Sequence, residues 1–445
     1  MFSTYGSNMT AHDHDEYNIT RIREASLPTT HRFAGRHDGG PAIHYVDDLA
    51  RVLVDVSPDG DRTRSFERAG PRRQIAFDPA TTTAAVLTSG GLCPGLNAVI
   101  SAVVMGLHYH YGVSRILGIP NGYAGLMPPR QKDILPITPE RIRGIARTGG
   151  SFLGSARIKP DVRAIVDTLQ AFSIDLLFCV GGDGTQRGAH AIHEEILKRG
   201  LTISVVGIPK TIDNDINWME KTFGFETAVE LARQAITAGN TEAECAINGI
   251  GLVKLMGRNS GFITANASIA ARDVNYTLVP EVPFQLDGDK GLFASLERRL
   301  ARRGHAVVVV AEGAGQELMT PETAQFDKSG NKLHQDIGLF LRDEINAHFK
   351  AKKIDVALKY IDPSYIIRAA PANASDTILC TTLGHNAVHA AMAGKTDMIV
   401  GCWNGQVTHV PIPLAVKGRK MIEPSGELWR QVLESTGQGP LVNRG

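Results

Sequence analysis

The sequence contains few cysteines, and charge of neither sign predominates. Its five cysteines form no CxxC pair and no spacing typical of zinc ligands, which argues against a disulfide scaffold and a structural zinc domain. Lys and Arg total 47 and Asp and Glu total 46, so the net charge of +1 does not favour nucleic acid or an anionic membrane as the main partner. No apolar run is long enough to span a membrane, and the first residues lack the apolar core of a signal peptide. We therefore expect a protein of the reducing cytoplasm.

The remaining composition is that of an ordinary globular protein. The 445 residues are 43% hydrophobic and 21% charged, which is enough chain for roughly two to three domains. Residues 1–80 are polar and contain only short apolar runs. We expect them to form an N-terminal extension that packs on the main body or supports assembly.

From Thr82 onward, short runs of β-branched residues end in glycine or a polar residue, and most lead into helical patterns. Examples are AAVLTSGG, IDLLFCVGGDGTQRG, ISVVGIPKTIDND and GHAVVVVAEGAG. Such runs predict parallel strands covered on both faces, in an open doubly wound α/β fold whose ligands bind beyond the carboxyl ends of the strands. Because these units extend from about 82 to 415, the sequence predicts two such mostly parallel-sheet domains facing across a cleft.

Two glycine-rich segments join a predicted strand to a predicted helix. In VGGDGTQRG, the glycines allow backbone N–H groups to approach phosphate oxygens, and Asp183 is a natural ligand for a bridging magnesium ion. The alternative is a tight turn with Asp183 as a helix cap. The second segment, TSGGLCPGLNAVI, can supply further backbone hydrogen-bond donors to a nucleotide. Alternatively, its glycines can reflect close packing of strand and helix.

The segment PKTIDND places two aspartates one residue apart. In an extended segment, Asp213 and Asp215 would point to the same side, so that one can act as a base while the other helps to hold a metal. Lys210 and Thr211 could contact phosphates. The alternative interpretation is a turn rich in Asp and Asn.

Three arginines are candidates for binding a phosphorylated substrate, because guanidinium groups bind phosphate in a bidentate manner. They are Arg157, Arg258 and Arg368, each among Gly, Ser or aromatic residues. The alternative is that they are solvated surface charges. His108 and His110 fall in a helical pattern, and we interpret them as surface residues.

Taken together, these stretches resemble a phosphofructokinase from about Thr82 to at least Trp403. The matching motifs are TSGGLCPGLNAVI, GIPNGYAGL, GGSFLGSAR, VGGDGT, PKTIDND, KLMGRNSGF, AEG and YIIR. The long chain is similar to the branch that holds pyrophosphate-dependent, plant and trypanosome-type enzymes. The resemblance implies Mg²⁺-dependent phosphorylation of the 1-hydroxyl of fructose 6-phosphate in a homotetramer or homodimer. It also implies a nucleotide domain (81–225 plus 369–415) and a fructose 6-phosphate domain (226–368 plus 416–445).

The resemblance also assigns roles to single residues. Asp213 would be the base, with Thr211 beside it, and Asp183 and Asp215 would bind magnesium. Gly91 and Arg157 would contact the phosphoryl group during transfer. The phosphoryl donor would be bound by these two residues together with Gly182, Asp183, Gly184, Thr185 and Lys210. The sugar phosphate would be bound by Thr211, Asp213, Asp215, Met256, Gly257, Arg258, Glu312, Lys359, Tyr365 and Arg368.

Two positions bear on the identity of the phosphoryl donor, and they point in opposite directions. Gly184 leaves room for a nucleotide where pyrophosphate-dependent enzymes typically have an acidic residue. Lys210, by contrast, matches the lysine of pyrophosphate-dependent enzymes, although it is compatible with either donor. We expect ATP, with pyrophosphate as the alternative and a non-catalytic regulatory subunit as a third possibility. Lys359 and Gly249 differ from the two intersubunit arginines of bacterial ATP-dependent enzymes.

Overall fold

The computed structural model describes residues 16–31, 45–319 and 334–443, and the chain divides into two compact units. Unit 1 comprises Met1–Lys210, Ile216–Thr222 and Thr377–Gly418. Unit 2 comprises Thr211–Asp215, Phe223–Asp376 and Arg419–Gly445. These boundaries differ from the predicted ones. Residues 211–215 group with unit 2. The described part of residues 1–80 groups with unit 1, and two of its strands, Arg51–Leu53 and Ser65–Arg68, join the main sheet.

The large sheet of unit 1 contains nine of the strands seen in the described residues. Their order is β2 (Arg51–Leu53), β3 (Ser65–Arg68), β15 (Gln406–Pro411), β14 (Met398–Trp403), β9 (Ser204–Pro209), β8 (Leu176–Gly181), β5 (Thr83–Thr88), β6 (Arg115–Ile119) and β7 (Leu135–Pro136). The five strands from β14 to β6 are parallel, whereas the outer strands are antiparallel. Every residue of β5, β8 and β9 is buried, as the continuous apolar runs predict.

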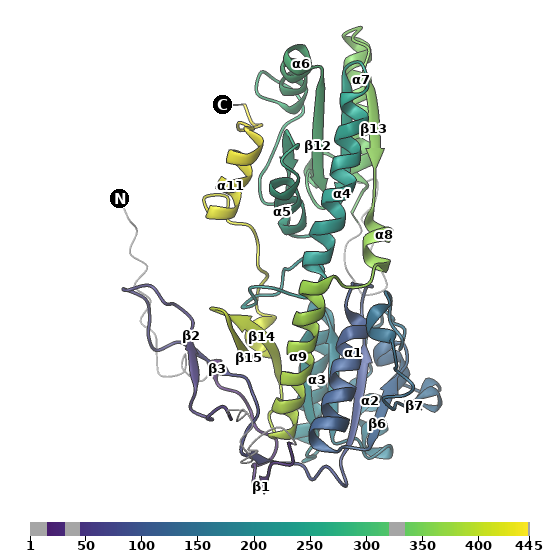
Figure 1. Ribbon diagram of the computed structural model, residues 1–445, viewed down its shortest axis with the longest axis vertical. Coiled ribbons are helices and arrows are strands. Elements are labelled where there is room, and N and C mark those ends of the chain that lie inside the picture. Colours follow the sequence, from purple (N-terminus) through teal and green to yellow (C-terminus); the bar gives the residue numbers. More distant parts are fainter. Residues whose placement is uncertain (1–15, 32–44, 320–333, 444–445) are drawn as a thin grey trace, which may run out of the picture. The chain divides into compact units, whose positions relative to one another are not determined.

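Helices cover both faces of this sheet. In Figure 1, α1 (Leu96–Met105) and α9 (Ala374–Met392) lie in front of the strands, and α3 (Asp183–Lys198) lies behind them. The remaining helical segments of unit 1 are α2 (Val162–Ala171), α10 (Ile412–Ala415), η2 (Gly106–Tyr111), η3 (Gly122–Leu126), η4 (Arg130–Asp133) and η5 (Ile145–Arg147). The fold is therefore doubly wound, as predicted.

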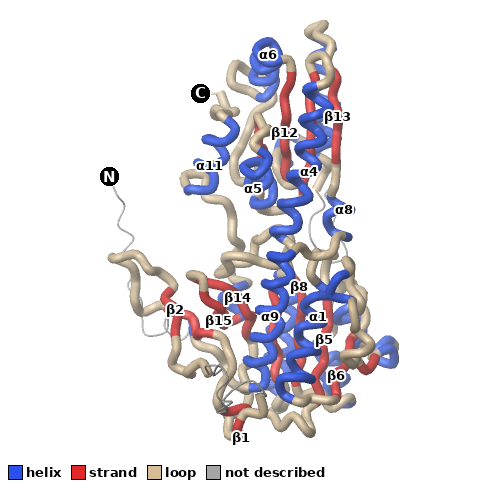
Figure 2. Tube along the Cα trace, viewed as in Figure 1, coloured by secondary structure: helices blue, strands red, loops and turns tan. Residues whose placement is uncertain are grey.

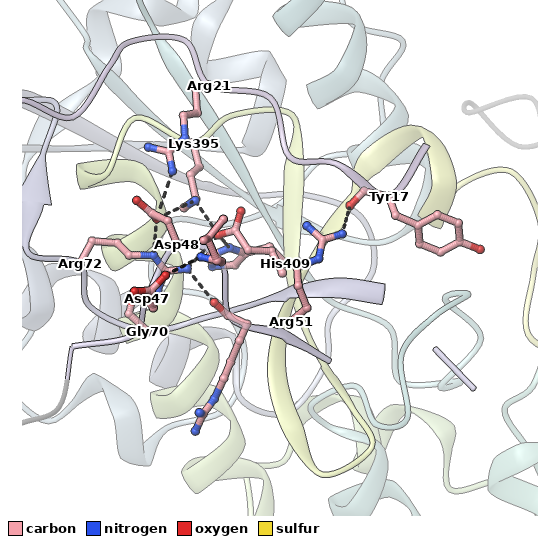
Figure 3. Close-up of polar contacts among 12 residues, drawn as sticks. Tyr17, Arg21, Asp47, Asp48, Arg51, Gly70, Arg72, Lys395 and His409 are labelled. Atoms are coloured by element: carbon pink, nitrogen blue, oxygen red, sulfur yellow. Dashed lines mark hydrogen bonds and ion pairs between the residues drawn. The ribbon is translucent and has the colours of Figure 1, made fainter. Parts of the chain in front are cut away.

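The segment before residue 80 is fixed to the sheet by a buried ionic cluster. Glu67, in β3, accepts hydrogen bonds from Arg72 Nη2 at 2.8 Å and pairs with Lys395 Nζ and His409 Nδ1. Figure 3 shows Arg72, Lys395 and His409 converging on one point. Burial alone would raise the pKa of Glu67, but the bonds from His409 and Lys395 hold that pKa well below its ordinary value. A short second sheet pairs β1 (Leu27–Pro28) with β4 (Gln74–Ile75).

Unit 2 has a smaller sheet in which every strand is parallel to its neighbours. Its order is β11 (Tyr276–Leu278), β12 (His305–Ala311), β10 (Gly249–Leu255) and β13 (Ala357–Ile361). The helical segments of this unit are α4 (Phe225–Glu244), α5 (Phe262–Ala271), α6 (Leu292–Arg303), α7 (Ile337–Ala351), α8 (Ser364–Ala369), α11 (Glu427–Thr436) and η6 (Gln316–Leu318). Figure 2 shows helices and strands alternating here too. Among the described residues, no helix has both the length and the apolar character needed to cross a membrane.

Candidate active site

Two neighbouring strands of unit 1, β5 and β8, lead into the glycine-rich segments, and the adjacent β9 leads into Lys210. β5, β8 and β9 are parallel, so their carboxyl ends lie at one edge of the sheet. The backbone bonds continue past the strand ends, because Ser89 N donates to Val180 O at 2.9 Å and Lys210 N donates to Gly181 O at 3.0 Å. The side chain of Lys210 then donates from Nζ to Gly91 O at 2.9 Å. One edge thus gathers both glycine-rich segments and a lysine, which we call the glycine cluster.

Arg157 belongs to the same edge. A Cβ atom added to Gly91 would lie 3.1 Å from Arg157 Nη2, so the guanidinium group lies against the glycine turn. Ser155 Oγ donates to Gly90 O at 2.5 Å, and Ser89 Oγ donates to Ala156 O at 3.2 Å. These bonds fix the loop that carries Arg157. Exposed backbone and a guanidinium group together suit the binding of phosphate oxygens.

Helix α3 begins directly within the glycine-rich segment VGGDGTQRG. Gly182 is its N-cap, and Asp183 lies in its first turn, where a negative charge is favoured. Asp183 Oδ2 accepts a hydrogen bond from Arg187 Nε at 3.1 Å. A Cβ atom added to the exposed Gly184 would meet no atom within 4 Å, so this side of the turn is open. Thr185, in contrast, is buried beneath it.

In unit 2, the segment Thr211–Asp215 forms a turn. Asn214 has a φ of 57°, a left-handed conformation that asparagine tolerates, so the prediction of an extended segment was wrong. The turn still brings side chains together, because Thr211 Oγ1 donates to Asp215 Oδ1 at 2.7 Å. Ser260 Oγ donates to Asp213 O at 3.4 Å. The turn is therefore fixed to the loop that follows β10.

Asp213 has a strongly perturbed carboxyl group. Its Oδ1 atom is buried and has no hydrogen-bond partner in the described residues. Burial, followed by the charges of Asp215 and Glu312, raises the pKa of Asp213 to about 7, although Arg368 and the backbone N–H of Arg258 oppose the shift. A carboxylate with a pKa near neutrality and an unsatisfied oxygen fits a general base.

Four further predicted residues of unit 2 follow the ends of two adjacent parallel strands. Met256, Gly257 and Arg258 follow β10, and Glu312 follows β12. Glu312 N donates to Leu255 O at 2.9 Å, which joins the two strand ends. Gly257 has a φ of 127°, and a Cβ atom there would lie 2.5 Å from Ser260 O, so the turn requires glycine.

Arg368 reaches this group from α8. Its Nε atom lies 3.3 Å from the buried Met256 Sδ, and it acts on the charge of Asp213. Within the described residues, Lys359 and Tyr365 make no hydrogen bond or ion pair with Asp213, Glu312 or Arg368. Both are exposed, Lys359 on β13 and Tyr365 with 83% of its surface accessible on α8.

The sequence reasoning missed an ionic contact that supports α8. Lys254, on β10, pairs through Nζ with Asp336 Oδ2 at 2.7 Å and with Asp362 Oδ2 at 2.9 Å. Asp362 Oδ1 accepts a hydrogen bond from Ser364 N at 3.0 Å, at the start of the helix that carries Arg368. A lysine inside the otherwise apolar run of β10 was the available signal.

Comparisons with known proteins agree on one family. The family model described as "Phosphofructokinase" matches residues 83–391. A Borreliella burgdorferi protein named ATP-dependent 6-phosphofructokinase is 48% identical over 408 residues, which cover 89% of this chain and 91% of that protein. The Arabidopsis thaliana ATP-dependent 6-phosphofructokinase 7 is 48% identical over 88% of this chain and 81% of its own. The Trypanosoma brucei brucei protein named ATP-dependent 6-phosphofructokinase is 44% identical, over 95% and 87% respectively.

Solved structures show the same fold at lower identity. The pyrophosphate-dependent phosphofructokinase of Marinobacter aquaeolei aligns with a TM-score of 0.67 and 20% identity, over 81% of this chain and 92% of its own. The phosphofructokinase of Pichia pastoris in the T-state aligns with a TM-score of 0.62 and 23% identity, over 76% of this chain and 35% of its own.

Proposed function

Because the chain belongs to the phosphofructokinase family, we propose that it is an ATP-dependent 6-phosphofructokinase. The observation that carries the chemistry is the raised pKa of Asp213, whose buried oxygen has no hydrogen-bond partner among the described residues. The reaction transfers the γ-phosphoryl group of ATP to the 1-hydroxyl of fructose 6-phosphate and yields fructose 1,6-bisphosphate and ADP. The names of relatives at 44–48% identity support ATP as the donor.

In unit 2, the proposed step begins with the sugar phosphate held in place. Arg368 supplies positive charge for its phosphate, together with Tyr365 and, from a neighbouring subunit, Lys359. Met256, Gly257, Arg258 and Glu312 hold the sugar. Asp213 accepts the proton of the sugar 1-hydroxyl. The hydroxyl oxygen forms a bond to the γ-phosphorus, and the bond from that phosphorus to the β–γ bridging oxygen breaks. The charge of Arg368 beside Asp213 keeps part of the carboxyl population ionised.

In unit 1, we assign the phosphates of ATP to the glycine cluster. Backbone N–H groups of Gly182 and Gly184 at the start of α3 suit phosphate oxygens, as does the positive charge of Lys210. Thr185 N donates to Gly182 O at 2.9 Å, so Thr185 would contribute by holding the turn in shape. Gly91 permits close approach of the transferring group, and Arg157 stabilises its charge.

The residues present fit a magnesium ion. Asp183 is half-buried and lies in the first turn of α3. Arg187 Nε donates to its Oδ2 atom, and carboxylate oxygens are ligands of the kind that Mg²⁺ prefers. No group of three or more His, Cys, Asp or Glu in the described residues could hold a metal by itself. The ion would take its other ligands from phosphates and water and would neutralise phosphate charge when bound. Asp183 would be its ligand in unit 1, and Asp215 is a further ligand only through the resemblance.

Pyrophosphate is the second candidate donor. Lys210 favours pyrophosphate, because it matches the lysine of the pyrophosphate-dependent enzymes that the sequence resembles. The open space beside Gly184 favours ATP. In this structure, the ammonium group of Lys210 is hydrogen-bonded to Gly91 O, which is a role compatible with either donor. The space beside Gly184 is the feature that a nucleotide requires and pyrophosphate does not.

We also propose a cytoplasmic homotetramer, with a homodimer as the alternative. The exposed Lys359 is expected to serve a neighbouring subunit's site, because in the described residues it makes no hydrogen bond or ion pair with Asp213, Glu312 or Arg368. The five cysteines are all free thiols, which fits a reducing compartment. The mass from light scattering distinguishes the tetramer from the dimer, and a monomer would contradict both.

The pH dependence of catalysis should report Asp213. A base must be deprotonated, so kcat/KM is expected to fall as pH decreases through about 7. Asp215→Asn removes a like charge that raises this pKa, so the acidic limb should move to lower pH. The exposed Asp273 provides a matched control, because Asp273→Asn should leave the limb in place. An unchanged limb in Asp215→Asn would contradict this electrostatic account.

The proposed function itself is tested by identifying the product. The purified chain is incubated with fructose 6-phosphate, ATP and Mg²⁺, and phosphorus NMR follows the signals. We expect a new phosphate ester at C1 and ADP in equal amounts, and no new ester when a chelator removes Mg²⁺. Hydrolysis of ATP without a sugar bisphosphate, or no reaction with either ATP or pyrophosphate, would contradict the proposal.

A further inference from the structure

Gln186 is an unusual residue for its place in the fold. It follows the Gly181–Thr185 turn directly, in the first part of α3, and its side chain is completely buried. Glutamine is mostly exposed in folded proteins, and a buried amide requires hydrogen-bond partners. A leucine or methionine would fill the same volume without this requirement, so the amide itself calls for an explanation.

The Gln186 amide spans the ends of two strands. Its Nε2 atom donates to Gly181 O at 2.9 Å and lies 3.3 Å from both Cys179 O and Ile208 O. The first and second of these carbonyls belong to β8, and the third belongs to β9. One side chain therefore ties together the carboxyl ends of both strands.

The surrounding chain makes room for this arrangement at a cost. A Cβ atom on Gly207, in β9, would lie 2.1 Å from Gln186 Oε1, so only glycine allows the amide to rest on the strand. Among the described residues, Oε1 itself has no hydrogen-bond partner. An unsatisfied buried acceptor is unfavourable for stability. Its presence indicates that the donors on the other side of the amide serve a purpose other than packing.

The strand ends that Gln186 joins lead straight into the glycine cluster. Gly181 precedes Gly182 and Asp183, and its carbonyl accepts bonds from both Gln186 Nε2 and Lys210 N. Ile208 lies two residues before Lys210, whose ammonium group reaches Gly91 O. On the other side of the turn, Tyr123 Oη donates to Thr185 O at 2.7 Å. The contacts of one amide thus add to the backbone bond from Lys210 N to Gly181 O in setting the relative position of Asp183 and Lys210.

We infer that Gln186 is a positioning residue for the phosphoryl-donor site, acting through the ends of β8 and β9 on Asp183 and Lys210. This inference rests on the proposed function, in which those two residues bind ATP and its metal. Gln186 does not touch the substrate itself, since it is fully buried. Its loss loosens the two strand ends, so it weakens the handling of ATP and leaves the binding of the sugar phosphate intact.

The test compares Gln186→Leu with a stability control on the same helix, Ile192→Val, which shortens a fully buried side chain away from the glycine cluster. We expect kcat/KM for ATP to fall by about 10- to 100-fold in Gln186→Leu, with the KM for fructose 6-phosphate within about twofold of wild type. Ile192→Val should lower the melting temperature and keep both KM values. Equal kinetics in the two variants, or an equal loss for both substrates, would overturn the inference.

A second variant keeps the inference testable if Gln186→Leu does not fold. Gln186→Glu has the same shape, and a buried carboxyl group facing three carbonyls is held neutral at moderate pH, where it can donate one hydrogen bond. Its kcat/KM for ATP should therefore lie below wild type and fall further as pH rises and the group ionises. A profile that parallels wild type at every pH would overturn the inference. A wild-type chain that is inactive with ATP would instead contradict the proposed function.

Discussion

Asp213→Asn should lower kcat by about 10²- to 10⁴-fold, the usual contribution of a general base. Asparagine keeps the shape of the side chain but cannot accept the proton of the sugar hydroxyl. The groups proposed to hold the sugar phosphate, Arg258 and Arg368, stay in place, so the dissociation constant for fructose 6-phosphate should change little. Stopped assays give kcat, and calorimetry gives the binding constant. A kcat within tenfold of wild type would remove Asp213 as the base.

The same variant should be more stable than wild type, and this effect depends on pH. The folded-state pKa of Asp213, about 7, lies above its ordinary value of 3.8, so the folded protein disfavours the ionised form. This destabilisation is absent below pH 4, grows as pH rises from about 4 to about 7, and is complete above 7. Asp213→Asn should therefore raise the melting temperature at pH 8 and have much less effect at pH 4. A lower melting temperature at pH 8 would indicate a structural role.

Gly184→Asp should nearly abolish the use of ATP. A Cβ atom at this position meets nothing within 4 Å, and Gly184 lies inside α3 without a positive φ, so the fold can accept the substitution. The new carboxylate would stand in the space assigned to the nucleotide. Repulsion between charges about 4 Å apart near a protein surface amounts to roughly 4 kcal/mol, which corresponds to a loss in kcat/KM of about 10²- to 10³-fold.

Because Lys210 is retained, the Gly184→Asp variant should also gain activity with pyrophosphate. Gly439→Asp is a matched control, since this exposed glycine also has no atom within 4 Å of an added Cβ and lies in unit 2. It should leave both activities unchanged. Unaltered ATP kinetics in Gly184→Asp would show that Gly184 does not face the nucleotide. A loss of ATP activity without a gain with pyrophosphate would show that space at this position does not alone select the donor.

The parts of the fold that could be predicted were those with a local cause. The apolar runs of β5, β8 and β9 are buried throughout, and their glycines mark the turns that follow. Local chemistry also made Asp183 and Asp213 candidates, because both carboxylates follow the ends of buried strands. Neither inference required knowledge of residues distant in the sequence.

The errors arose where distant residues decide the conformation. His110 was interpreted as a surface residue, but it is half-buried, with ring centroids 4.7 Å from His385 and 5.1 Å from His31. Lys254 pairs with Asp336, 82 residues away, and the local pattern marks the lysine as unusual without revealing its partner. The left-handed φ of Asn214 was missed because the residues of this segment are compatible with both an extended conformation and a turn.

The initial rate with fructose 6-phosphate and Mg²⁺, measured side by side with ATP and with pyrophosphate, tests the central claim most directly. The account predicts turnover with ATP and little or none with pyrophosphate, because the space beside Gly184 admits a nucleotide and the Lys210 ammonium group serves either donor. Turnover with pyrophosphate alone would contradict it, and would mean that Lys210, not the open space, selects the phosphoryl donor.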